Sequence, residues 1–218
     1  MIGIIRISPF LPDAGLPPFF GKDKWKMVKT CHESFLKAGE CSHRVYLLDK
    51  CPDEWENYFE KFGIVYRGNW GKKGSLYNAY EVAETLSGNI LFLEDDYLWR
   101  PNTLATLEEG VSHFGMASPY DHPDGYSHAC QEITVLNNKT WRWCPTNTHT
   151  FAVKAEIFQN NLDNFYYGTH DWQMFTKLQI DGFRLYTPLY SLATHLVEGK
   201  LAHNIDWESL VKKYETKM

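Results

Sequence analysis

The feature that most constrains the fold of this chain is a short apolar run that ends in three consecutive acidic residues. The run covers residues 90–93; a turn-forming Gly-Asn pair precedes it, and Glu94, Asp95 and Asp96 follow it. A short apolar run bounded by turn-forming residues is typical of a strand buried on both faces in a parallel sheet. We therefore expect residues 90–93 to form a central strand that carries the acids at its carboxyl end.

These acids predict a ligand site. Adjacent carboxylates repel one another by about 1 kcal/mol per close pair in water unless a cation or hydrogen-bond donors lie among them. In open α/β sheets, ligands bind at the carboxyl ends of the strands. The alternative is a solvated turn whose acids cap the next helix. Pro101 argues against that alternative, because it begins a plausible helix further on and leaves the acids at the sheet edge. We predict a site for a metal ion and phosphate.

Predicted strands and helices alternate through the first half of the chain. Strands are expected at residues 3–8, 44–48, 64–66 and 90–93, and helices at 22–38, 52–60, 75–86 and 102–109. This alternation predicts an α/β fold with right-handed crossovers and a central, mostly parallel sheet flanked by helices, of nucleotide-binding type.

The second half of the chain has a different pattern. Short strands are expected at residues 114–118, 132–136, 140–143, 150–154 and 183–190, helices at 170–180 and 207–214, and a polar aromatic loop at 164–169. No linker rich in Pro, Gly or Ser divides the chain. We therefore expect one domain, residues 1–218, with a nucleotide-binding half at about 1–100 and a half for the second substrate at about 101–218.

Charge, cysteines and hydropathy exclude several classes of protein. The net charge of −5 argues against a general nucleic-acid-binding protein. We find no run long enough for a membrane helix and no signal peptide. The five cysteines form no Cys-x-x-Cys pair, which favours free thiols and a cytoplasmic location. A zinc site at Cys31, Cys41 and Cys51 remains an alternative.

The order of several segments is informative. A hydrophobic strand ends in Leu93-Glu94-Asp95-Asp96, after segments 3–8, 45–49 and 78–80 and before Thr169-His170-Asp171-Trp172. This order resembles the GT-A (Rossmann-like) fold glycosyltransferases over residues 3 to about 195, with Glu-Asp-Asp as a variant of their Asp-x-Asp motif. Two features depart from the family patterns, because the acidic motif is not Asp-x-Asp and the base motif is His-Asp rather than Glu-Asp. No G-x-G-x-x-G or Walker motif is present.

The resemblance implies roles for several residues. A divalent cation, Mn²⁺ or Mg²⁺, offsets the charge on a departing diphosphate, and hard oxygen ligands hold it. Asp96 is the expected first metal ligand, and His195 resembles the C-terminal histidine that completes the metal shell. Asp95 would contact the ribose and Glu94 the donor sugar, although these two roles could be exchanged. His195 could equally be a surface or core histidine, and His203 is a weaker candidate for its role.

Other candidate residues lie at the ends of predicted strands and helices. Asp171 is the candidate general base, and the alternative is an acid that stabilises a helix N-terminus. Asp49 would lie near the base and ribose of the nucleotide, or it is a turn acid. Lys73, beside Lys72 and a helix start, would bind an anion of the nucleotide sugar, or it is a solvated turn lysine. Aromatic residues at 166–167 and Trp172 could pack on sugar rings.

The sequence therefore predicts a metal-dependent, inverting glycosyltransferase of the hexosyltransferase type. It would transfer a sugar from a nucleotide-sugar donor, most plausibly a UDP-sugar, to a carbohydrate or glycoconjugate acceptor. One alternative is a sugar-1-phosphate nucleotidylyltransferase, although Pro9-Phe10-Leu11-Pro12 replaces the Gly-rich basic loop that such enzymes carry after the first strand. A second alternative is a non-catalytic carbohydrate-binding module with a structural metal.

Overall fold

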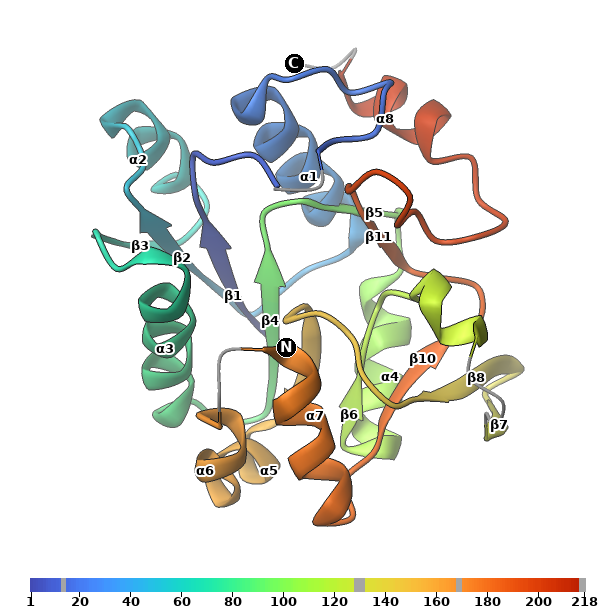
Figure 1. The fold of residues 1–218 in the computed structure, drawn as a ribbon. Coiled ribbons are helices and arrows are strands. Elements are labelled where there is room, and N and C mark those ends of the chain that lie inside the picture. Colours follow the sequence, from blue (N-terminus) through green and yellow to red (C-terminus); the bar gives the residue numbers. More distant parts are fainter. Residues whose placement is uncertain (13–14, 128–131, 168–169, 216–218) are drawn as a thin grey trace.

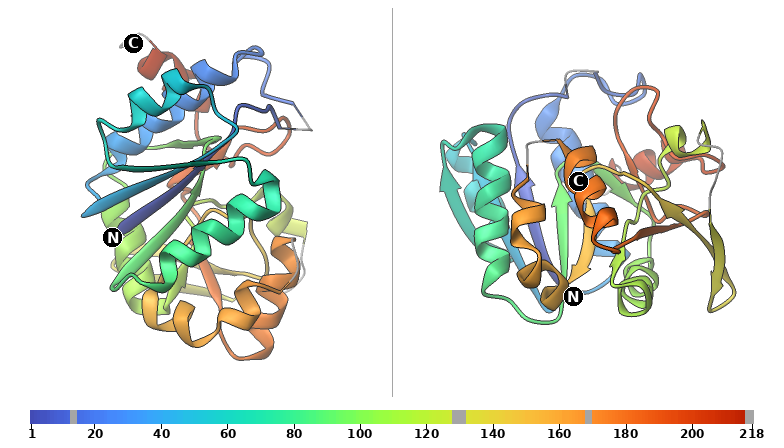
Figure 2. Two further views of the ribbon diagram at one scale, coloured as in Figure 1. Left: turned by 90° about the vertical axis from the view of Figure 1, so that its left-hand side faces the viewer. Right: turned by 60° about the horizontal axis from the view of Figure 1, so that its bottom comes forward.

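The computed structural model describes residues 1–12, 15–127, 132–167 and 170–215. Within these residues, nine strands form one sheet in the order β3-β2-β1-β4-β9-β6-β10-β8-β7, with helices on both faces (Figures 1 and 2). The strands are β1 (Ile2–Ile7), β2 (His43–Asp49), β3 (Ile64–Gly68), β4 (Asn89–Glu94), β6 (Met116–Ala117), β7 (Ile133–Leu136), β8 (Lys139–Cys144), β9 (Phe151–Lys154) and β10 (Leu185–Pro188). The predicted α/β fold with a largely parallel sheet is confirmed.

Helices connect the strands and cover the sheet. They are α1 (Lys24–Ala38), α2 (Asp53–Phe59), α3 (Gly71–Glu84), α4 (Leu104–Phe114), α5 (Ala155–Asn160), α6 (Leu162–Phe165), α7 (Asp171–Ile180) and α8 (Trp207–Glu215), with a 3-10 helix η1 (Pro123–Ser127). None of the helices in the described segments is long and apolar enough to span a membrane.

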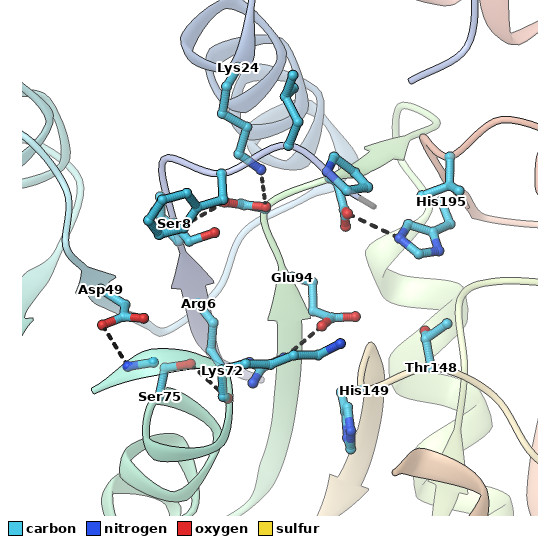
Figure 3. A pocket seen from close by; sticks show the side chains of 18 of the residues that line it. Arg6, Ser8, Lys24, Asp49, Lys72, Ser75, Glu94, Thr148, His149 and His195 are labelled. Atoms are coloured by element: carbon cyan, nitrogen blue, oxygen red, sulfur yellow. Dashed lines mark hydrogen bonds and ion pairs between the residues drawn. The ribbon is translucent and has the colours of Figure 1, made fainter. Parts of the chain in front are cut away.

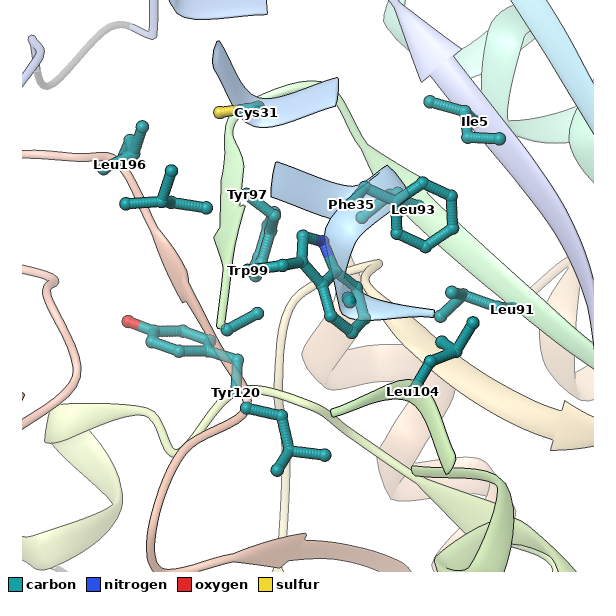
Figure 4. Close-up of a cluster of buried hydrophobic side chains, with 14 of the residues drawn as sticks. Ile5, Cys31, Phe35, Leu91, Leu93, Tyr97, Trp99, Leu104, Tyr120 and Leu196 are labelled. Carbon is teal, nitrogen blue, oxygen red and sulfur yellow. The ribbon is translucent and has the colours of Figure 1, made fainter. Parts of the chain in front are cut away.

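The predicted central strand is β4, and its side chains divide the core. Leu91 and Leu93 pack into one buried cluster with α1, whereas Ile90 and Phe92 pack into the cluster on the α3 face. Figure 4 shows the first cluster, where Leu91 and Leu93 lie with Trp99. Both faces of the strand are therefore buried, as a continuous apolar run requires.

Strands β3, β2, β1 and β4 are parallel, so their carboxyl ends meet at one edge of the sheet. Strand β9 then lies antiparallel between β4 and β6, and β8 runs antiparallel to both β10 and β7. The short strands predicted in the second half are present, although β6 and β10 are shorter than predicted. Helices α5 and α6 were not predicted.

A small second sheet was also not predicted. Strands β5 (Tyr97–Trp99) and β11 (Ala193–His195) pair antiparallel directly after the acidic motif, with His195 opposite Tyr97. The expected helix at 102–109 is α4, which begins at Leu104 and not beside Pro101. The β5–β11 pairing holds the C-terminal segment beside Asp96.

The cysteines agree in part with the prediction. Cys31, Cys41, Cys51 and Cys144 are free thiols, and Cys130 lies outside the described residues. No group of three or more His, Cys, Asp or Glu side chains suited to a metal ion occurs in the described part of the chain, which gives the zinc alternative no support.

Candidate active site

A cleft opens at the carboxyl ends of β1, β2 and β4, where the sequence predicts the ligand site. Its volume is about 560 Å³, and Figure 3 shows the side chains that line it. The walls come from the β1–α1 loop, the ends of β2 and β4, the first turn of α3, the N-terminus of α7 and the segment after β11. Six of the seven predicted site residues line this cleft: Asp49, Glu94, Asp95, Asp96, Asp171 and His195.

Each acid of the motif has a basic partner. Glu94 Oε1 lies 2.6 Å from Arg6 Nη2, and Asp95 Oδ1 lies 2.8 Å from Lys24 Nζ. Asp96 Oδ2 lies 3.0 Å from His195 Nε2. The repulsion expected among three adjacent carboxylates is therefore offset by three basic side chains from β1, α1 and β11.

Asp96 and His195 form a charged pair on one side of the cleft. Burial opposes charge on the imidazole, but Asp96 and the other two acids outweigh it and raise the pKa of His195. Burial would raise the pKa of Asp96, but His195 outweighs it and lowers that pKa. The His195 ring also stacks on Tyr97, with centroids 4.9 Å apart. This packing fixes the imidazole beside the carboxylate.

The donor atoms of this pair fit a metal that shares its ligands with a substrate. Asp96 Oδ1 is buried and has no hydrogen-bond partner among the described residues. One carboxylate oxygen and one imidazole suit Mn²⁺ in particular, while Mg²⁺ prefers oxygen ligands. Because the described residues hold no group of three ligating side chains, the other ligands would come from substrate phosphates and water.

Both carboxylate oxygens of Asp95 accept hydrogen bonds from other residues of the protein. Its Oδ1 accepts from Lys24, and its Oδ2 accepts from the backbone N–H of Ser8 at 2.8 Å. Its side chain is 9% exposed, and that of Lys24 is 8% exposed. Ser8 and Lys24 flank the β1–α1 loop, so Asp95 fastens both ends of one wall of the cleft. These contacts use both oxygens that the predicted ribose contact would need.

Asp49 lies where β2 meets α3. Its Oδ1 accepts from the backbone N–H groups of Trp70 at 2.6 Å and Gly71 at 3.1 Å, so it caps the start of α3. The helix therefore begins at Gly71, four residues before the expected helix at 75–86, and Lys72 in its first turn lines the cleft. Lys73 is not among the lining residues, and its amine lies 5.1 Å from the Tyr77 ring centroid.

Asp171 occupies the first position of α7 and lines the cleft. Burial raises the pKa of its carboxyl group, while the N–H of Trp172 donates to Oδ1 at 2.7 Å and opposes that change. Asp171 therefore has both features that the sequence allowed, a helix N-terminal position and a partly desolvated carboxylate. Thr169 of the same motif lies outside the described residues.

None of the aromatic candidates lines the cleft, and neither does His203. Tyr166 bonds Glu84 and Tyr167 lies under the amine of Lys177, and neither lines the cleft. His203 packs near Tyr126, also away from the cleft. Trp172 does not line the cleft either, but it directly follows Asp171, which does.

Sequence reasoning missed the partners of the acids. Arg6 was recognised only as part of a strand, and Lys24 only as part of a helix. The only sequence signal for either residue was its position, because Arg6 lies near the end of a parallel strand and Lys24 is the first residue of the helix that follows. No pattern in the sequence pairs either residue with a particular carboxylate.

Comparisons with known proteins show the fold. No family model matches the sequence, and a search of curated proteins finds no match. A solved nucleotidyl transferase from Methanothermobacter thermautotrophicus is 14% identical with a TM-score of 0.58, covering 100% of this chain and 99% of its own. The inositol-1-phosphate CTP transferase from T. maritima is 14% identical with a TM-score of 0.52, covering 98% and 96%.

A third solved structure has the same fold. CMP:2-keto-3-deoxy-manno-octonic acid synthetase, solved with CTP, is 13% identical with a TM-score of 0.57 and covers 100% of this chain and 99% of its own. At this level of identity, these similarities establish the architecture and not the activity. This chain has the α/β fold of the nucleotidyltransferases, which resembles the predicted GT-A fold.

Proposed function

We propose that this protein is a metal-assisted transferase that uses a nucleotide-activated substrate. The observation that carries the proposal is the state of the Asp96 carboxylate. One oxygen bonds His195, and the other is buried with no hydrogen-bond partner in the described part of the chain. This carboxylate lies in a cleft of about 560 Å³ at the carboxyl edge of the sheet, where α/β proteins bind ligands.

We assign a separate role in substrate binding to each charged residue of the cleft. Asp96 and His195 would hold the divalent cation, which when bound offsets negative charge on the phosphates. Lys50 and Lys72 line the cleft and would face the same phosphates. Asp49 fixes the start of α3 beside the nucleotide. Asp95 would position the β1–α1 wall rather than contact the ribose.

Two reactions are compatible with such a site. The names of the similar solved structures support nucleotidyl transfer, in which a nucleoside triphosphate reacts with a second substrate and releases pyrophosphate. They support this alternative better than the glycosyltransferase hypothesis that led the sequence analysis.

Side chains of this chain support glycosyl transfer instead. A triphosphate needs many donors, yet the loop after β1 begins with Pro9 and includes Pro12, and proline has no backbone N–H. Arg6 and Lys24 line the cleft but already pair with acids of β4. These features weigh against a triphosphate, so we propose glycosyl transfer as the first candidate and nucleotidyl transfer, which the similar solved structures favour, as the second.

In glycosyl transfer, Asp171 would act as the general base. An acceptor oxygen would form a bond to the anomeric carbon while the bond from that carbon to the diphosphate breaks. The nucleoside diphosphate would leave with the bonding electron pair, and Asp171 would take the hydroxyl proton. Direct displacement of this kind inverts the anomeric centre.

Product analysis separates the two reactions. Purified protein is incubated with Mn²⁺ or a chelator and with UDP-, GDP- and CMP-sugars, or with CTP and UTP plus sugar 1-phosphates. Release of a nucleotide from a nucleotide sugar, without pyrophosphate, supports glycosyl transfer. Pyrophosphate formed from a triphosphate supports nucleotidyl transfer. No turnover, together with no nucleotide binding by calorimetry, would refute both and favour the binding-module alternative.

Substitution of Asp96 tests the metal ligand directly. Asp96→Asn keeps the shape of the side chain and removes the charge, and Asp96→Ala removes both. We expect turnover to fall by more than about 100-fold, beyond the 10–100-fold typical of outer-shell partners of a metal. The melting temperature should change little. Asp163→Asn, an exposed acid on α6, is the matched control. Retained activity in Asp96→Asn would contradict the assignment.

A further inference from the structure

A smaller pocket lies beside the cleft and shares part of its wall. This side pocket has a volume of about 160 Å³, and Thr148 and Asp171 line both spaces. The rest of its wall consists of His122, Asp124, Gly125, Pro145, Thr146, Asn147 and Trp172. The space is suited to a ligand about the size of one sugar ring. A group bound there would lie next to the candidate base.

One side of the pocket is aromatic and the other is polar and held in place. Trp172 is 55% exposed although it is large and apolar. Asn147 is buried, and its Nδ2 donates to Ser118 Oγ at 2.8 Å and to the Tyr120 carbonyl at 2.7 Å. An exposed aromatic face beside fixed polar groups suits a sugar ring, which has apolar C–H faces and hydroxyl edges.

The lining of the pocket contains no lysine or arginine among the described residues. Its charged groups are the carboxylates of Asp124 and Asp171, and Asp124 accepts from Lys200 Nζ at 2.7 Å. Burial lowers the pKa of His122 to about 4, so this imidazole is neutral near pH 7. The described lining therefore offers no cation to oppose the charge of a phosphate.

A buried arginine packs behind the wall of the pocket. Arg142 is fully buried, and its Nε lies 2.6 Å from Asp121 Oδ1. Its Nη2 donates to the carbonyl of His122 at 3.2 Å, which fixes the loop that forms one wall. A Cβ at Gly125 would lie 2.2 Å from this nitrogen, so the loop is packed directly on the guanidinium. This charge supports the wall and is balanced by Asp121.

We infer that the side pocket binds one neutral sugar ring of the second substrate, which packs on Trp172 and directs a hydroxyl toward Asp171. The inference rests on the proposed function and favours glycosyl over nucleotidyl transfer, because a sugar 1-phosphate is an anion. Like-charge contact with Asp171 disfavours such an anion, and so does the lack of a cation among the described lining residues.

The test compares neutral and anionic sugars with the same protein. Methyl glycosides of common hexoses and N-acetylhexosamines, and the corresponding sugar 1-phosphates, are titrated in the presence of UDP and Mn²⁺. Binding is followed by saturation-transfer NMR on wild type, Trp172→Ala, Trp172→Phe and Tyr66→Ala. Tyr66 is an exposed aromatic on β3 outside both pockets and serves as the control.

We expect at least one neutral glycoside to bind at least tenfold more weakly to Trp172→Ala, with binding largely kept in Trp172→Phe and unchanged in Tyr66→Ala. The inference is overturned if no glycoside binds, if Trp172→Ala binds as wild type does, or if a sugar 1-phosphate binds more tightly than its glycoside. Calorimetry with nucleotides separates the two proposals. Nucleotide binding without glycoside binding refutes the side pocket alone, whereas loss of both refutes the transferase.

Discussion

The buried histidine of α1 gives a pH dependence of stability that can be worked out from the structure. His32 is 6% exposed, and its two ring nitrogens lie 3.1 Å and 2.9 Å from the hydroxyls of Tyr58 and Tyr46. Burial, followed by the charge of Arg44, lowers the pKa of His32 from 6.5 to about 3. The folded protein therefore holds this imidazole neutral at pH values where an exposed histidine is charged.

The size of the effect follows from the two pKa values. Because the folded pKa is depressed, the stability is fully present above pH 6.5 and is lost as the pH falls from 6.5 toward 3. In that window the unfolded chain binds a proton that the folded chain does not, so unfolding becomes easier by up to ~1.4 kcal/mol per pH unit. Between about pH 7.5 and about pH 5, His32 alone should reduce the free energy of unfolding by roughly 2 kcal/mol.

The assay is urea unfolding, followed by tryptophan fluorescence at both pH values, of wild type, His32→Gln and His43→Gln. His43 is exposed at the start of β2 and is the control. His32→Gln should lose about 2 kcal/mol less than wild type between the two pH values, because other titrating groups cancel in the comparison. His43→Gln should follow wild type. An equal loss in His32→Gln and wild type would refute the reasoning.

Two further predictions concern the walls of the cleft. Lys24→Met leaves the buried Asp95 carboxylate without its cation and should lower the free energy of unfolding by about 3–5 kcal/mol, measured in urea, with partial recovery when Asp95→Asn is added. An unchanged stability in Lys24→Met would contradict the ion pair. Asp49→Ala removes the acceptor at the start of α3 and should cost about 1 kcal/mol, with faster hydrogen exchange in its first turn. Asp53→Ala, at an exposed acid, should leave that exchange unchanged.

The sequence predicted the first half of the fold well because its signals are local. Each strand there is a short apolar run, and local residues mark where a helix begins or ends. For example, Asp23 Oδ1 accepts from the N–H of Lys26 at 3.0 Å and caps the N-terminus of α1. A parallel sheet built from such units has one plausible topology. The edge that carries the site then follows from the strand direction alone.

The second half was harder to predict because its pairings are not local. Strand β9 inserts antiparallel between β4 and β6, and no turn signal beside it indicates that position. Strands β5 and β11 have three residues each and come from distant parts of the chain. His195 was chosen through the family resemblance, whereas the contact that brings it to Asp96 depends on this pairing.

The sequence predicted that the acidic motif needs cations or hydrogen-bond donors, but it did not predict which residue would pair with each acid. Three adjacent carboxylates need cations or donors, and the structure provides a different partner for each one. Sequence spacing could not show that both carboxylate oxygens of Asp95 would accept hydrogen bonds from Lys24 and Ser8, because these contacts depend on how α1 packs beside β4. The same spacing could not show that Lys72 rather than Lys73 would line the cleft, because this depends on the residue where α3 begins.

The pairing of the acids also explains why one of them is the better metal ligand. Arg6, Lys24 and His195 together offset most of the negative charge, so the motif does not need a cation merely to fold. Of the three carboxylates, Asp96 has a buried oxygen that lacks a partner within the described residues, and leaving such an oxygen unsatisfied costs about 1–3 kcal/mol or more for a charged group. A divalent ion on Asp96 would remove that cost, whereas an ion on Asp95 would first have to break its contacts with Lys24 or Ser8. The contacts of the two carboxylates thus indicate a structural role for Asp95 and a ligand-binding role for Asp96.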